Sequence, residues 1–101
     1  MNRDESEVLH VVSTWVDEGA MRDLRARVEK GRATYGGLEL DNDGRRYLVE
    51  ACEELADACF YLACEVSYRR RSYGDGAMVA LLGHFTGLVW CQARRLIAWG
   101  Q

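Results

Sequence analysis

The sequence predicts an all-α protein, a four-helix bundle-like subunit formed by one domain over residues 1–101. Three observations support this class. The chain contains no proline, so no position forbids a helix. Apolar residues recur three and four positions apart in four separate stretches, which is the period of an amphipathic helix. A chain of 101 residues that is 49% hydrophobic and 29% charged is typical of one globular domain with a modest core.

The first predicted helix covers residues 4–18. Asp4 and Glu7 stand three positions apart and resemble a capping box. Gly19 is a plausible end, because glycine adopts the left-handed capping conformation without strain. A second helix is expected from Ala20 to about Thr34.

The second predicted helix is basic. Met21, Leu24 and Val28 form its apolar stripe, and the remaining positions carry five cations, Arg22, Arg25, Arg27, Lys30 and Arg32. Such a surface is usually solvated. The functional alternatives are contact with phosphate and docking onto an acidic helix.

Residues 35–44, YGGLELDNDG, break the helical period and predict a loop. Asp41 or Asp43 is expected to cap the following helix. That central helix is predicted over residues 45–70, and a tight turn over residues 72–76 leads to a last helix over residues 77–99. Because the loops are short, neighbouring helices are expected to be antiparallel.

The last predicted helix is apolar most of the way round. One side carries Leu81, Phe85, Leu88, Val89, Leu96 and Trp99, and the other carries Val79, Trp90 and Ile97. A helix of this kind is buried on more than one side. A chain this short has too few layers to cover it, so a homo-oligomer, a dimer or a tetramer, is expected.

The central helix has two contrasting sides. Apolar residues three and four positions apart form one side: Leu48, Cys52, Leu55, Cys59, Leu62 and Val66. On the other side Glu50, Glu53, Glu54 and Asp57 fall within an arc of about 100°. No basic residue lies between Tyr47 and Tyr68, so these acids lack the i+4 cations that usually stabilise a solvated helix.

This acidic side has three interpretations. It is solvated, or it docks the basic second helix or a basic partner, or it binds divalent cations. Carboxylates one helical turn apart are suited to Mg²⁺, which takes oxygen ligands and retains waters. Tyr61 and Cys64 share this side and would line a pocket there. The arginines that end the helix, Arg69 among them, suit its carbonyl end and are also able to hold phosphates.

Charge and composition exclude several function classes. The net charge of −3 gives no support for bulk nucleic-acid binding. The start, MNRDESE, is too charged for a signal peptide, and the apolar run over residues 77–91 is short for a membrane span. The four cysteines form no CxxC pair and are expected to be reduced. A cytoplasmic protein without membrane contact is therefore expected.

Two segments together resemble a known family. Residues 27–37, RVEKGRATYGG, and residues 50–62, EACEELADACFYL, look like the MazG-like all-α nucleoside triphosphate pyrophosphohydrolases, especially the short phage-type members. In that family a basic helix ends in a Tyr-Gly turn, and the next helix carries an ExxExxD-type motif before a Tyr-Leu pair. The resemblance covers about residues 22–66.

The resemblance implies Mg²⁺-dependent cleavage of a (d)NTP to a (d)NMP and pyrophosphate, with Mn²⁺ as an alternative metal. It also implies dimers or tetramers whose acidic faces turn inward around the metal. Carried over by position, the metal ligands would be Glu50, Glu53, Glu54 and Asp57, with Glu53 and Glu54 catalytic. Lys30 and Tyr35 would lie near phosphate or base, joined as substrate-binding candidates by Tyr61 and Arg69.

Two alternative functions stay open. Many family members carry a spaced ExxE pair on the preceding helix, and this chain has none at that distance. The first alternative is a non-catalytic module that binds or sequesters a nucleotide on the same scaffold. The second is a helical protein-interaction module whose acidic side docks a basic partner.

Overall fold

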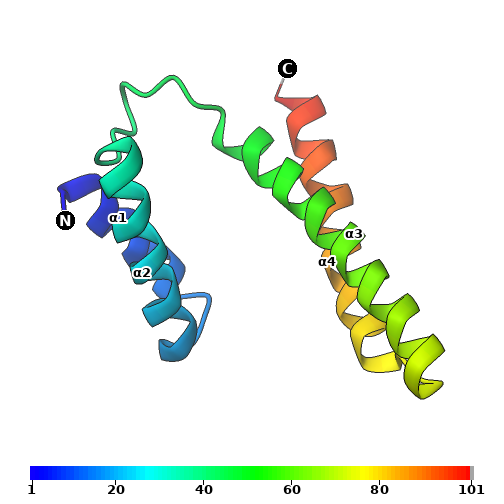
Figure 1. Ribbon diagram of the computed structural model, residues 1–101. Coiled ribbons are helices and arrows are strands. Elements are labelled where there is room, and N and C mark those ends of the chain that lie inside the picture. Colours follow the sequence, from blue (N-terminus) through cyan, green and yellow to red (C-terminus); the bar gives the residue numbers. More distant parts are fainter. Residues whose placement is uncertain (101) are drawn as a thin grey trace. The chain divides into compact units, whose positions relative to one another are not determined.

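A computed structural model of the chain describes residues 1–100. Over these residues it contains four helices and no strand: α1 (Arg3–Ser13), α2 (Glu18–Tyr35), α3 (Tyr47–Tyr73) and α4 (Ala77–Trp99) (Figure 1). The predicted all-α class is confirmed. The chain divides into two compact units, the first comprising Met1–Arg45 and the second beginning at Arg46. The single domain over residues 1–101 stays a prediction, and each unit is described by itself.

Helix α1 begins at a capping box formed by Asn2 and Glu5. The Asn2 side chain accepts the Glu5 backbone N–H at 2.9 Å, and the Glu5 carboxylate accepts the Asn2 backbone N–H at 2.9 Å. The predicted Asp4–Glu7 box is wrong, because the same motif two residues earlier already satisfies these amides. Asp4 instead accepts the backbone N–H of Leu40 at 2.9 Å.

The boundary between α1 and α2 also differs from the prediction. Helix α1 ends at Ser13, before the expected residue 18, and Trp15 is exposed in the connection. Asp17 caps α2 by accepting the Ala20 backbone N–H at 2.8 Å. Gly19 therefore lies in the first turn of α2, and its predicted role as a helix stop is wrong. The N-cap residue, Asp17, lies two residues before Gly19, so the helix has already begun when the chain reaches the glycine.

Polar contacts fasten α1 to α2 and to the loop that follows. The buried Glu5 carboxylate pairs with the guanidinium of Arg32, and the Asn2 amide donates to the Leu38 carbonyl at 2.9 Å. Leu9 and Met21 are the buried apolar residues of this unit. The first unit is thus held by a small apolar contact and by the bonds of Asn2 and Glu5.

Helix α3 begins one residue after Arg46, which makes no side-chain capping bond. Asp43 accepts the Arg45 backbone N–H at 3.0 Å, ahead of the helix, so the prediction that Asp41 or Asp43 caps α3 is wrong. Helix α3 continues past the expected residue 70 to Tyr73. It ends at Gly74, whose φ of 75° is the left-handed capping conformation that favours glycine.

Helices α3 and α4 pack against each other along their length, joined by residues 74–76 (Figure 1). The predicted apolar side of α3 faces α4: Val66 is buried, and Cys52, Leu55, Cys59 and Leu62 are half-buried. Leu48, at the start of this side, is exposed. On α4 the buried residue is Ala93, and Gly83 lies beside α3, where a Cβ on it would be 4.0 Å from the Leu62 Cβ.

Helix α4 shows the two apolar sides that its sequence predicted. Val79, Trp90 and Ile97 are half-buried toward α3, whereas the side that carries Leu81, Phe85, Leu88, Val89, Leu96 and Trp99 is exposed. Among the residues that the structure describes, no helix is both long and apolar enough to cross a membrane.

Candidate functional site

The four predicted metal ligands lie on the outer side of α3. With about 100° of rotation per residue, Glu50, Glu53, Glu54 and Asp57 are centred roughly 180° from the side that packs on α4. Glu53, Glu54 and Asp57 are exposed, and Glu50 is half-buried. We call these four residues the acidic surface. Its orientation follows directly from the apolar side, because burying the apolar side against α4 turns the acids away from α4.

Three carboxylates of the acidic surface, those of Glu53, Glu54 and Asp57, are not neutralised from within the described part of the chain. Over residues 1–100 the side chains of Glu53, Glu54 and Asp57 form no hydrogen bond or ion pair. Glu53 and Asp57 are four positions apart, and Glu54 and Asp57 are three, so these like charges oppose each other across one helical turn. Their lone pairs are available to an external cation.

Carboxylate oxygens are suitable ligands for Mg²⁺, but those of the acidic surface do not converge on one point. Within the described part of the chain, no group of three His, Cys, Asp or Glu side chains is placed to hold a metal ion. A cation on the acidic surface would therefore depend on side-chain movement and on further oxygen ligands from water or phosphate.

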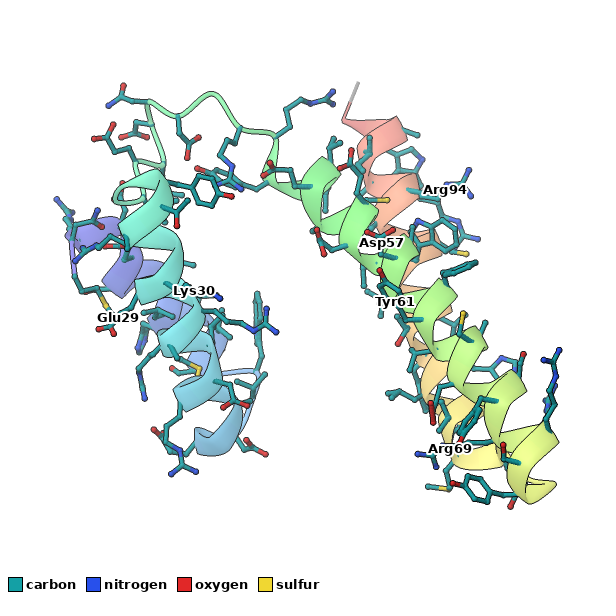
Figure 2. The ribbon with its side chains drawn as sticks, viewed as in Figure 1. Glu29, Lys30, Asp57, Tyr61, Arg69 and Arg94 are labelled. Carbon is teal, nitrogen blue, oxygen red and sulfur yellow. The ribbon has the colours of Figure 1, made fainter. Side chains whose placement is uncertain are left out.

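Tyr61 extends the acidic surface by one helical turn. It follows Asp57 by four residues and is 70% exposed, and Figure 2 shows both residues on successive turns of α3. Its ring meets that of Phe60 edge to face, with centroids 6.3 Å apart. The structure thus places an exposed aromatic pair beside the carboxylates, where a flat ligand would have a surface to contact.

Arg69 lies apart from the acidic surface. Its Nε donates to the Glu65 carboxylate at 2.7 Å, an i,i+4 ion pair on the exposed side of α3. This hydrogen bond raises the pKa of Arg69 above its usual value. The predicted role of Arg69 in substrate binding therefore requires exchange of Glu65 for a ligand oxygen.

Lys30 and Tyr35 belong to the α1–α2 unit. Both are exposed on α2, and Tyr35, the last residue of the helix, is 88% exposed. Gly36, with a φ of 83°, ends the helix directly behind Tyr35. The Tyr-Gly turn of the sequence is therefore a helix end that presents its tyrosine to solvent.

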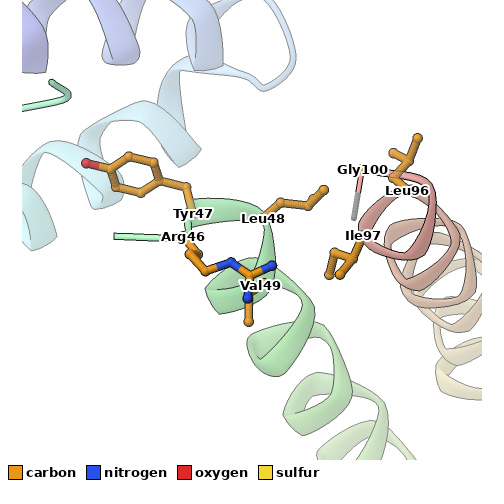
Figure 3. Close-up of a pocket in the computed structure, with 7 residues that line it drawn as sticks. All are labelled: Arg46, Tyr47, Leu48, Val49, Leu96, Ile97 and Gly100. Atoms are coloured by element: carbon orange, nitrogen blue, oxygen red, sulfur yellow. The ribbon is translucent and has the colours of Figure 1, made fainter. Parts of the chain in front are cut away.

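Two grooves along α3 and α4 were not predicted. One, of about 680 Å³, runs beside the glycines of α4 and is lined by Cys59, Val66, Arg70, Gly83, His84, Gly87 and Cys91, among others. The other, of about 290 Å³, lies where α3 begins and α4 ends (Figure 3). It is lined by Arg46, Tyr47, Leu48, Val49, Leu96, Ile97 and Gly100. The spacing of Ala80, Gly83 and Gly87 was the available signal, because small residues leave space beside a helix contact.

Comparison of the chain with protein-family models, with curated protein sequences and with solved structures finds no match in any of the three. The resemblance to the MazG-like pyrophosphohydrolases therefore stays a prediction carried by residues 27–37 and 50–62.

Proposed function

We propose that the protein is a Mg²⁺-dependent nucleotide pyrophosphohydrolase that cleaves a (d)NTP to a (d)NMP and pyrophosphate. One observation carries the proposal: Glu53, Glu54 and Asp57 are exposed together on one side of α3, with no cation to pair with in the described part of the chain. A solvated helix normally offsets such charges with Lys or Arg at i+4. A divalent cation supplies that offset from outside.

The donor set fits the metal in chemical type. Carboxylate oxygens are the ligands of Mg²⁺, which completes its octahedron with waters and substrate phosphate oxygens. When bound, Mg²⁺ would polarise phosphoryl oxygens and lower the pKa of water. Mn²⁺ accepts the same oxygen ligands.

Side chains of the protein would supply the proton acceptor, the metal ligands and the contacts to the base and the phosphates. The Glu53 or Glu54 carboxylate would accept the proton of the water that attacks the α-phosphorus, and the other would hold the cation together with Glu50 and Asp57. Tyr61 offers its exposed ring to the base. By the resemblance, Lys30 and Arg69 would supply positive charge for the leaving pyrophosphate and Tyr35 a second aromatic surface, and these three roles stay predictions that the acidic surface itself does not carry. A nucleotide substrate agrees with a cytoplasmic location, which stays a prediction.

The direct test is an activity panel with matched variants. Purified protein is incubated with NTPs and dNTPs in Mg²⁺ or Mn²⁺, and products are separated by chromatography. We expect monophosphate and pyrophosphate from at least one substrate, with turnover lowered about 100-fold or more by Glu54→Gln, in the range of losing a general base. Glu7→Gln, an exposed glutamate of α1, is the control and should retain activity.

The non-catalytic alternative on the same acidic surface has its own signature. A nucleotide-sequestering module binds nucleotide in calorimetry, depends on Mg²⁺ and produces no monophosphate. The same Glu54→Gln protein then loses binding, whereas in the enzyme it loses turnover first. The two functions are separated by measuring both quantities on one preparation.

A helical protein-interaction module is the second candidate, and the exposed apolar side of α4 favours it. Large exposed apolar patches mark interaction sites in soluble proteins. For this function, Mg²⁺ changes neither the melting temperature nor the oligomeric state, and Glu54→Gln changes only binding to a basic partner.

A further inference from the structure

The exposed apolar side of α4 forms one continuous surface. Eight large apolar residues between 46% and 78% exposed occupy it: Met78, Leu81, Leu82, Phe85, Leu88, Val89, Leu96 and Trp99. At about 100° per residue they fall within an arc of roughly 120° centred away from α3. We call this set the α4 apolar surface. It runs from the second residue of the helix to the last one.

No charged residue interrupts the α4 apolar surface. Gln92 is the single polar residue within its arc, and its side-chain oxygen accepts a hydrogen bond from Arg95 at 3.3 Å. His84, Arg94 and Arg95 lie outside the arc, with Arg94 over the ring of Trp90 at 5.9 Å. A surface without charge brings no like-charge repulsion when it meets an identical copy of itself.

The area of this surface matches that of a stable dimer. Eight side chains of roughly 150–200 Å² each, exposed by about half to three quarters, present on the order of 800 Å². A standard interface buries about 800 Å² on each partner. Soluble monomers rarely expose an apolar patch this large, so we expect another surface to cover the α4 apolar surface.

We propose that the occupant is a second copy of this chain, and that two α4 apolar surfaces pack antiparallel about a two-fold axis near Leu88 and Val89. Both copies then contribute the same residues of α4 to the interface, as an isologous interface requires. Leu81 meets Leu96 of the second copy, Met78 meets Trp99, and Phe85 meets Gln92. Each copy contributes α3 and α4, and the four helices lie in a row with the two α4 helices at its centre and an α3 helix at each outer side.

The flanking arginines favour the antiparallel arrangement. Arg95 borders the α4 apolar surface near its C-terminal end. In a parallel pair the two Arg95 side chains would stand at the same level, with like charges close together. In the antiparallel pair each Arg95 lies near Leu82 of the second copy, and the charges are at opposite ends of the interface.

This interface leaves the acidic surfaces facing outward. The acidic surface is on the side of α3 turned away from α4, and the α4 apolar surface is on the side of α4 turned away from α3. Pairing through α4 therefore puts the two sets of carboxylates at opposite outer faces of the dimer. The resemblance implies the reverse, acidic faces turned inward, so any cation site on α3 is not completed across this interface. The inference is independent of the proposed function.

Two phenylalanines provide matched variants for the test. Phe60 and Phe85 are 69% and 60% exposed and are the two phenylalanines of the chain. A Cβ on Gly83 would lie 4.0 Å from the Leu62 Cβ, which fixes the pairing level of the antiparallel helices. Phe60 precedes Leu62 by two residues and Phe85 follows Gly83 by two, so both phenylalanines stand at one level, on different helices.

The experiment is sedimentation of the full chain at a series of concentrations. We expect wild type at twice the 11.5 kDa chain mass, or at a multiple of that dimer. Phe85→Lys should raise the dimer dissociation constant about 30-fold or more, as loss of a central anchor does. Phe60→Lys should stay within about threefold of wild type. A tetramer that Phe85→Lys reduces to dimers supports the proposal equally.

A second measurement covers the case in which Phe85→Lys loses its helical circular dichroism. In a background with the exposed cysteines replaced, Cys64→Ser and Cys91→Ser, we expect Val89→Cys to give a covalent dimer with a short bismaleimide. Phe60→Cys and the background protein should not. A monomeric wild type overturns the proposal, whether residues 1–45 or another protein then cover the surface. Equal dissociation by both lysine variants, or no cross-link at Val89→Cys, overturns it too.

Discussion

The carboxylate of Glu5 pairs with the guanidinium of Arg32 and joins the first turn of α1 to the last turn of α2. The Asn2 backbone N–H, donating to Glu5, holds the pKa of this carboxyl below its usual range, and Arg32 lowers it further. This ion pair links two helices that have few buried apolar residues between them. Ionisation of Glu5 therefore bears directly on the stability of this unit.

The lowered pKa of Glu5 predicts a pH-dependent stability difference. A carboxyl whose folded pKa is depressed contributes stability above its unfolded pKa, near 4.5, and that contribution is lost as pH falls through the folded pKa. Glu5→Gln should be less stable than wild type at pH 7, and the difference should shrink below about pH 4. Urea unfolding at several pH values measures it. A pH-independent difference would contradict the role of the charge.

Loss of the Asn2 cap should weaken α1. Asn2→Ala removes the bond to the Glu5 backbone N–H and the bond to the Leu38 carbonyl, so we expect a loss of about 1 kcal/mol or somewhat more. Asn42→Ala, in the exposed loop, is the control, with a change within about 0.5 kcal/mol. Equal effects in urea unfolding would show that the cap contributes nothing.

Gly76, the residue that precedes α4, and Gly87 within α4 should respond oppositely to alanine. A Cβ on Gly76 would come within 3.0 Å of the Val66 carbonyl oxygen, whereas one on Gly87 has no atom within 4 Å. Gly76→Ala is expected to destabilise the α3–α4 pair by about 1 kcal/mol or more through overpacking. Gly87→Ala should stabilise it by about 0.5–1 kcal/mol through helix propensity. Thermal unfolding of the two variants side by side gives the signs, and reversed signs would refute the packing of Gly76 on Val66.

Divalent cations should stabilise the protein through the acidic surface. At 100 times the dissociation constant, Mg²⁺ adds about 2.7 kcal/mol, a shift of the melting temperature by several degrees. Without metal, Asp57→Asn should be more stable than wild type by about 0.5 kcal/mol, because it relieves repulsion with Glu53 and Glu54. With metal, Asp57→Asn should lose most of the shift that Glu7→Gln keeps. An identical shift in both variants would place the cation elsewhere.

The helical class and the two sides of α3 were predictable because they follow from periodicity. Val66 and Leu62 recur at helical spacing, and that spacing alone turns Asp57 to the opposite side. The same holds for α4, whose apolar residues on both sides indicated more contacts than one chain offers. These features depend on the order of residues along one helix, which the sequence contains.

Helix ends and grooves were less accessible to prediction. Asn2, Asp4 and Asp17 are all chemically able to cap a helix, and which of them does so depends on the tertiary bonds of each, such as that of Asp4 to Leu40. Gly19 follows a stronger signal, Asp17, and therefore lies inside α2. The groove beside Gly83 and Gly87 is lined by residues of both α3 and α4, so the pattern of either helix alone does not predict it.

The central claim is tested most directly by hydrolysis in ¹⁸O-labelled water with Mg²⁺ and the (d)NTP panel. The proposed function predicts monophosphate and pyrophosphate as products, with the label in the monophosphate, since water attacks the α-phosphorus. Glu54→Gln should lower the yield of labelled monophosphate about 100-fold or more, and Glu7→Gln should leave that yield unchanged. Absence of monophosphate with every nucleotide, or label in the pyrophosphate instead, would contradict the proposed function.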